Sequence, residues 1–195
     1  MAKYGAKYLQ WAPFAASNPE PDSSLPKYGT PANLGETVSV SDSPSFVEGK
    51  IYGDNALAEY VNEFKECPID VEVTELANSV ASSIFGATLG SGSDDTDLKF
   101  SGSDNAPYGG IGFYITKIVD NVVKYQGVYY PKVKAAMQGE TYQTKGENIS
   151  LTGGKVKFTG VTAKNGQWKI LSADLESESA AKTWVDAKIV AASGG

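Results

Sequence analysis

A run of alternating apolar and polar residues in the middle of the chain constrains the fold more than any other feature. Ile111, Phe113 and Ile115 recur at every second position, which is the spacing that places side chains on one face of a β-strand. The pair Asp120-Asn121 is typical of a turn, and residues 122–133 run back through a second apolar stretch. The pattern therefore predicts a long antiparallel hairpin.

Further segments show the composition or alternation of strands, separated by turn residues. Pro68 interrupts the longest of them and indicates a bulge or an edge position. Asn165-Gly166 is the best two-residue hairpin signal in the chain. These strands predict a mainly β (α+β) fold, an antiparallel β-sandwich or small barrel. The segments cover residues 36–41, 46–52, 59–73, 98–100, 149–151, 155–162 and 167–171.

Two segments have helical spacing and flank the predicted sheet. Thr74 is a suitable N-cap for a short helix that includes residues 76–84, and Gly86 is a natural stop. A C-terminal helix is predicted over about 177–192, with Ser177 as its N-cap. We expect Trp184 to anchor this last helix on the sheet.

The first 35 residues differ in composition from the rest of the chain. Residues 1–35 are rich in Pro, Ala, Ser and Gly, and they predict an extended N-terminal arm with a short strand around Lys3–Trp11 followed by loop. Residues 36–195 then form a single β domain. Polar loops are expected at residues 53–58, 87–97 and 139–147.

Composition narrows the classes of function. The 195 residues fit one domain and carry a net charge of −6 with no arginine, whereas a general nucleic-acid binder has a basic face. No apolar run approaches the roughly 20 residues that cross a bilayer, and we expect neither membrane insertion nor a secretory signal. The chain has no histidine, which excludes Ser-His-Asp and Cys-His catalysis.

The remaining chemical motifs do not form a site. The single cysteine, Cys67, excludes an intrachain disulfide and is expected to be a small buried residue. The acidic run at residues 94–97 lacks the EF-hand pattern, and Gly-Gly at 109–110 and 153–154 is not followed by the rest of a phosphate-binding loop. A glycosidase needs two carboxylates that can lie far apart in sequence, and nothing selects such a pair. We expect no enzyme, no catalytic residue, no cofactor and no metal site.

Four segments together resemble the major tail protein (tail tube protein) family of long-tailed, non-contractile bacteriophages. They are residues 1–5, 106–114, 129–134 and 144–149, in the family's order, and the resemblance extends to the C-terminal helix. It implies a β-sandwich or barrel of tail-tube type with a flanking α-helix, found in a structural virion protein. Residues 15–33 resemble an insertion, and residues 87–97 also depart from the family.

The resemblance also implies function and partners. Hexameric rings would stack into a tube, the conduit through which DNA passes from the capsid to the host cell. The partners would be further copies of the chain, the tape measure, distal tail and terminator proteins, and double-stranded DNA in transit without specific binding. The protein would be made in the bacterial host cytoplasm and reside in the virion. A net negative lumen would repel phosphate and ease transit.

An assembling protein reaches its neighbours through arms and loops longer than its own fold needs. The aromatic residues of the arm and the polar loops near residues 55 and 145 are therefore the predicted subunit or ring interface. An alternative class is a carbohydrate- or surface-binding β-sandwich module, since the chain has eleven tyrosines that could act as stacking platforms. The predicted interface residues are Tyr4, Tyr8, Trp11, Phe14, Asp54, Asn55, Leu57, Tyr142, Lys145 and Glu147.

Overall fold

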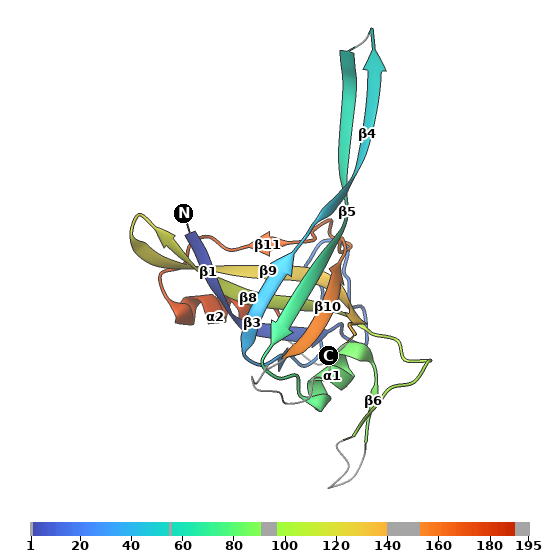
Figure 1. Ribbon diagram of the computed structural model, residues 1–195, viewed down its shortest axis with the longest axis vertical. Coiled ribbons are helices and arrows are strands. Elements are labelled where there is room, and N and C mark those ends of the chain that lie inside the picture. Colours follow the sequence, from blue (N-terminus) through green and yellow to red (C-terminus); the bar gives the residue numbers. More distant parts are fainter. Residues whose placement is uncertain (1, 55, 91–96, 140–152, 190–195) are drawn as a thin grey trace, which may run out of the picture.

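The chain forms a curled antiparallel sheet with helices α1 and α2 packed beside it (Figure 1). The computed structural model describes residues 2–54, 56–90, 97–139 and 153–189. The main path of the sheet has the strand order β2-β1-β8-β9-β10-β5-β3. The mainly β prediction is confirmed, and the sheet has the form of a half-barrel. The elements are β1 (Ala2–Pro13), β2 (Ala32–Asn33), β3 (Thr37–Asp42), β4 (Ser45–Gly53), β5 (Ala56–Val73), α1 (Asn78–Phe85), β6 (Thr88–Leu89), β7 (Leu98–Lys99), β8 (Tyr108–Val119), β9 (Val122–Met137), β10 (Gly154–Gly160), β11 (Ile170–Leu171) and α2 (Glu178–Lys188).

The predicted hairpin is confirmed as β8 and β9, which lie in the centre of the sheet. Ile111 and Phe113 are buried, as expected for alternate positions on the inner face of β8. The turn residues Asp120 and Asn121 have φ values of 50° and 62°. Two consecutive left-handed residues define a type I′ turn, and Asp and Asn adopt that conformation more readily than most residues.

The first strand is a full member of the sheet. The strand predicted around residues 3–11 is present as β1, but it pairs with β8 from Ala2 to Pro13 and does not extend outward as an arm. Leu9 and Trp11 are fully buried in the core. The local composition suggested an arm because pairing between β1 and β8, about a hundred residues apart, leaves no local pattern in the sequence.

Two hydrophobic clusters hold the helices against the sheet. On the inner face, Trp11 packs on Phe158 with ring centroids 5.5 Å apart, and Ile84 of α1 joins the same cluster. On the opposite face, α2 covers β8 and β9, and Val185 lies above Gly112. The absence of a side chain at Gly112 lets the helix approach the strand closely.

The structure confirms some of the predicted helix boundaries and corrects one. Gly86 ends α1 in the left-handed conformation with φ 70°, as predicted. The predicted cap at Thr74 is wrong, because the Thr74 amide donates to the Glu36 carbonyl and still belongs to the sheet. The Ser177 hydroxyl accepts a hydrogen bond from the Ala180 amide at 3.1 Å and caps α2 as expected.

Two loop predictions also change. Asn165-Gly166 lies in a turn in which the Ala163 amide donates a hydrogen bond to the Gln167 carbonyl at 2.9 Å. The strands on either side of this turn do not pair as a hairpin. Strand β10 pairs with β9 and β5, and β11 pairs with β9. The expected loop at 87–97 begins with the short strand β6, which pairs with β7, the strand predicted at 98–100. The strand predicted at 149–151 lies outside the described residues.

We expect Gly127→Ala to destabilise the fold. Trp184 of α2 packs directly on Gly127, and a Cβ there would overlap the indole ring, so the helix would have to move. Overpacking of this kind costs about 1–3 kcal/mol, or roughly 2–4 °C of Tm per kcal/mol. Thermal unfolding measures the change. Gly102→Ala is the control, since nothing lies within 4 Å of its new Cβ; equal Tm values for both variants would contradict the packing.

A protruding hairpin as the candidate assembly surface

The most conspicuous surface feature is a two-stranded ribbon that projects away from the body (Figure 1). Strands β4 and β5 pair along it from Ser45 opposite Glu66 to Gly53 opposite Ala56. β10 and β3 pair with β5 only from Cys67 onward. Among the described strands, β4 is thus the sole neighbour of β5 in the ribbon. Two-stranded ribbons are marginally stable by themselves.

The ribbon corrects the expectation of a loop at residues 53–58. The strands continue to Gly53 and resume at Ala56, so the reversal is a tight turn. Asp54 has φ 49° within that turn, a conformation that Asp tolerates. Gly-Asp-Asn is equally typical of a loop, and this explains the error. The apolar runs on both sides were a usable signal for a hairpin.

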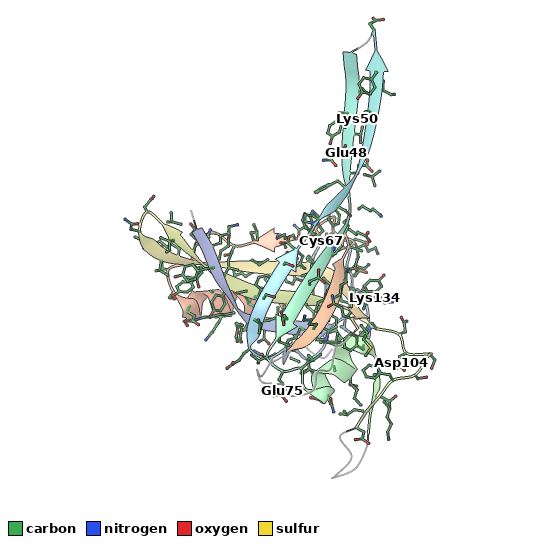
Figure 2. The ribbon with its side chains drawn as sticks, in the orientation of Figure 1. Glu48, Lys50, Cys67, Glu75, Asp104 and Lys134 are labelled. Carbon is green, nitrogen blue, oxygen red and sulfur yellow. The ribbon has the colours of Figure 1, made fainter. Side chains whose placement is uncertain are left out.

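Both faces of the ribbon expose large apolar side chains, and Figure 2 shows side chains extending on both sides of it. Cross-strand pairs place Val47, Ile51 and Val61 on one face, here the aliphatic face, with exposed fractions of 58%, 65% and 51%. Phe46, Tyr52 and Tyr60 lie on the other, the aromatic face, at 46%, 68% and 47%. Neither face has a core of its own. Contiguous apolar exposure of this kind marks an interaction site.

The ribbon is also acidic. Glu59 and Glu63 are exposed and share the aliphatic face with Val61. On the aromatic face, the Lys50 ammonium lies 3.2 Å from a carboxylate oxygen of Glu48. Hydrogen bonds from Lys50 and Tyr60 lower the pKa of the Glu48 carboxyl. Residues 45–66 carry five carboxylates and two lysines, which are Glu48, Asp54, Glu59, Glu63, Glu66, Lys50 and Lys65.

The root of the ribbon is fixed to the body by two contacts. Phe64 stacks on Trp168 with ring centroids 4.3 Å apart and an interplanar angle of 11°. The Lys169 ammonium donates to the Asp42 carboxylate at 2.6 Å, where β3 ends. The aromatic stack and the ion pair lie on either side of the junction between β3 and β4. They set the direction in which the ribbon leaves the body.

The contacts at the root of the ribbon shift the pKa of Asp42. Burial alone would raise the pKa of Asp42, but the hydrogen bond and charge of Lys169, together with the Tyr130 hydroxyl, hold it below its usual value. Burial raises the pKa of Tyr130, and the nearby Asp42 charge adds to that effect. The tyrosine therefore stays protonated and can donate to the carboxylate.

The predicted interface residues of the first strand are separated by the fold. Trp11 is fully buried, and its indole N–H donates to the Ser83 hydroxyl at 3.3 Å, so it has no surface for a partner. Phe14 is half-buried against Tyr28. The Tyr8 hydroxyl donates to Asp186 of α2 at 2.9 Å, whereas Tyr4 is 51% exposed.

The other predicted interface residues belong to the ribbon or lie outside the described residues. Asp54 is at the turn, and Leu57 is opposite Tyr52 in the strand pairing. Both residues therefore belong to the ribbon, and their place at an interface stays a prediction. Those outside the described residues are Asn55, Tyr142, Lys145 and Glu147. The sequence does not indicate the exposed residues of both ribbon faces, Val47 and Ile51 among them, because the pattern of residues 46–52 is equally typical of a strand inside a sheet.

The described residues contain one free cysteine and no metal-binding cluster. Cys67 is buried and free, as predicted, and burial raises the pKa of its thiol. Over residues 2–54, 56–90, 97–139 and 153–189, no group of three His, Cys, Asp or Glu side chains could hold a metal ion. None of the helices described has the length and apolar character needed to cross a membrane.

No protein-family model matches the chain, and no curated protein matches it.

We expect the stability contributed by Asp42 to depend on pH. Because its pKa is lowered by folding, the carboxylate stabilises the fold above the unfolded pKa of about 4, and this stability is lost as pH falls through the folded value. Asp42→Asn should therefore have a lower Tm than the wild type at pH 7, and the two Tm values should converge as the pH falls through the folded pKa of Asp42. The pair is partly exposed, so an effect of about 1 kcal/mol is expected.

Thermal unfolding from pH 2.5 to 8 tests this expectation. Glu75→Gln is the control, because Glu75 is an exposed carboxylate away from the ribbon root. A constant Tm difference between Asp42→Asn and the wild type across the whole range would show that the ion pair is not the cause.

Proposed function

We propose that this protein is a tail tube subunit of a long-tailed, non-contractile bacteriophage, in which hexameric rings stack into the conduit for DNA. The observation that carries the proposal is the acidic ribbon with apolar side chains on both faces, rooted in a curled antiparallel sheet. The resemblance of four sequence segments to the tail tube family supplies the ring and the tube.

The ribbon explains why an assembly is favoured over a monomer. It points away from the body (Figure 1), so another molecule must cover its faces. If that molecule is a further copy, the contact joins two different surfaces and repeats from copy to copy. Contacts of this kind generate closed rings or open helical arrays, and a stacked tube combines both.

The charge pattern of the sheet is compatible with passage of DNA. On the outer side of β5 and β10, Lys157 stands opposite Asp70 and Lys155 opposite Glu72. A channel wall built from this face would alternate in sign and would not present a continuous basic stripe. With a net charge of −6 and no arginine, such a wall would bind phosphate weakly. DNA would therefore pass without specific contacts.

Within this proposal, the tape measure protein occupies the same lumen before DNA does. The distal tail and terminator proteins meet the two ends of the tube. The chain is made in the bacterial host cytoplasm and resides in the virion.

A second candidate function is attachment to a carbohydrate or another surface. The aromatic face supports it, because Tyr52 and Tyr60 are exposed and could stack on sugar rings. The aliphatic face has no role in that function. A binding module would stay a small discrete species at all concentrations and would require Tyr52 and Tyr60, whereas a tube subunit polymerises.

Electron microscopy separates the two candidates. Purified protein is concentrated, negatively stained and compared with dilute protein run on size-exclusion chromatography. The tube proposal expects rings or tubes with an open channel seen end-on. A compact monomer at every concentration would contradict it.

We expect the aliphatic face to drive assembly without stabilising the monomer. Val47→Thr, Ile51→Thr and Val61→Thr keep the β-branched shape and remove apolar surface that is exposed in the single subunit. If each side chain becomes buried in the tube, each substitution should weaken the free energy of association by about 1 kcal/mol. The triple variant should therefore polymerise only at a concentration at least about tenfold higher.

Light scattering against concentration measures this threshold, and thermal unfolding of dilute protein should show a nearly unchanged Tm. The control is Val122→Thr, an exposed valine at the turn between β8 and β9. If the triple variant and this control assemble alike at the wild-type concentration, the ribbon is not the assembly surface.

A further inference from the structure

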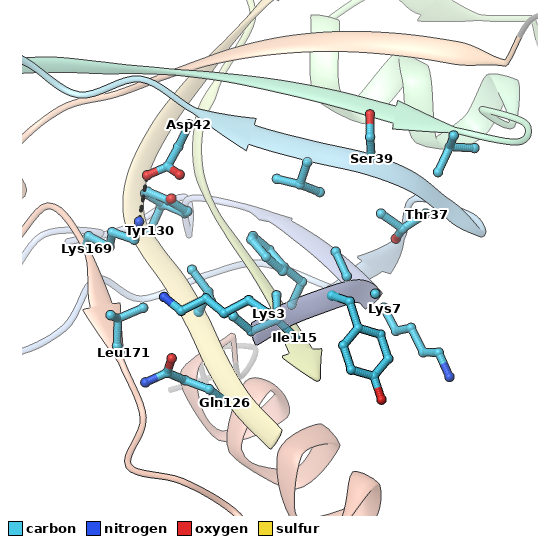
Figure 3. Close-up of a pocket in the computed structure, with 17 residues that line it drawn as sticks. Lys3, Lys7, Thr37, Ser39, Asp42, Ile115, Gln126, Tyr130, Lys169 and Leu171 are labelled. Atoms are coloured by element: carbon cyan, nitrogen blue, oxygen red, sulfur yellow. Dashed lines mark hydrogen bonds and ion pairs between the residues drawn. The ribbon is translucent and has the colours of Figure 1, made fainter. Parts of the chain in front are cut away.

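A groove lies where the half-barrel is open, between β1 and β3 (Figure 3). Its volume is about 600 Å³. Phe113, Ile115 and Val128 of β8 and β9 line its apolar part. Val38 and Leu171 also line it and are 57% and 48% exposed. The groove thus presents apolar surface to solvent, as the ribbon does.

The groove is bordered by strand edges that the described chain leaves open. From Ala2 to Lys7, β1 pairs with β8 on one side, whereas β2 reaches β1 only at Gln10 and Trp11. Strand β3 pairs with β5 on its other side. Among the described residues, no ladder joins β1 to β3. Open edges of this kind accept a strand from another chain.

The basic side chains of the groove are Lys3, Lys7 and Lys169. Lys169 is already paired with Asp42 at one end. Lys7 lies at the other end, near Glu178 of α2, whose pKa is lowered first by the hydrogen bond from Tyr114 and further by the charge of Lys7. Lys3 extends along the groove between them (Figure 3). With Asp42 as the one carboxylate among the lining residues, the groove carries a net positive charge.

The aliphatic face of the ribbon matches this groove in chemistry. It combines Val47, Ile51 and Val61 with Glu59 and Glu63, so it offers apolar contact together with two negative charges. Glu59 and Glu63 are four residues apart on one strand, which separates them by about 13 Å. Lys3 and Lys7 both lie on β1 and line the groove, with a bulge between Tyr4 and Ala6, so that Lys3 pairs with Lys117 and Lys7 with Tyr114.

We propose that the groove of each copy receives the ribbon of another copy, with the aliphatic face against the groove and Glu59 and Glu63 facing Lys3 and Lys7. This inference rests on the proposed assembly and names the surface that the ribbon binds. The ribbon cannot enter its own groove, because it leaves the body beyond Asp42 and points outward (Figure 1). Each copy therefore presents one ribbon and one groove, and the contact propagates head to tail.

Charge reversal tests the pairing. A groove variant carries Lys3→Glu and Lys7→Glu, and a ribbon variant carries Glu59→Lys and Glu63→Lys. Either variant alone would place like charges together at every contact, so its polymerisation threshold should rise at least about tenfold. In an equimolar mixture, each ribbon finds a groove of opposite charge. The mixture should therefore polymerise within about twofold of the wild-type threshold.

The controls separate pairing from general charge effects and from misfolding. Lys27→Glu and Glu75→Lys change exposed residues outside both surfaces, and they should assemble like the wild type. Thermal unfolding of the dilute variants establishes that each is folded. If both charge variants fail alone and the mixture also fails, or if either assembles normally, the groove is not the receptor.

Cross-linking gives a second measurement on the unaltered chain. Tubes grown from equal parts of isotopically labelled and unlabelled protein are treated with a zero-length carbodiimide and analysed by mass spectrometry. Mixed-isotope links from Lys3 or Lys7 to Glu59 or Glu63 support the proposal. Links from these carboxylates to lysines elsewhere, without any to Lys3 or Lys7, overturn it.

The two experiments also distinguish this inference from the proposed function. If the wild type forms tubes but the ribbon contacts another surface, the groove assignment fails and the tail tube proposal stands. If the wild type forms no ordered assembly under any condition, both fail.

Discussion

The structure depends on the continuity of one backbone, the eighteen-residue strand β5. From Cys67 to Val73 the strand pairs with β10, and from Ile69 to Val73 it also pairs with β3; Ile69 and Val73 are fully buried. From Ala56 to Glu66 it leaves the body paired with β4. Because the strand is continuous, the orientation of its buried half sets the direction of the ribbon. The Phe64–Trp168 stack holds the point where the ribbon leaves the body. The core therefore positions a surface that has no core of its own.

The described chain carries two exposed surfaces of different chemistry, which we propose to be the two halves of one contact. The ribbon has apolar and acidic side chains without a backing layer, and the groove between β1 and β3 has apolar and basic side chains beside open edges. Neither feature is explained by the stability of the single subunit. Exposed apolar area of this extent is stabilising only when a partner covers it. The two features together are the physical reason to regard the chain as a repeating unit.

Sequence reasoning succeeded where the determining pattern is local. Alternation around Ile111 and Phe113 identified the central hairpin, and Ser177 identified the start of α2, because a period of two or a cap depends on a few neighbouring residues. It failed where distant segments meet. The burial of Trp11 depends on β8 and β10, and the groove brings Lys3 beside residues of β3. The ribbon was read as strand and loop because turn residues do not specify how far a hairpin extends.

Hydrogen exchange of the ribbon amides tests most directly whether this surface is covered by further copies. Peptides from residues 45–66 are followed in dilute monomer and in concentrated, assembled protein, with peptides of β9 as an internal reference. The ribbon amides should exchange fast in the monomer and become strongly protected in the assembly, while the amides of β9 change little. Equal exchange of the ribbon in both states, with tubes present, would contradict the account.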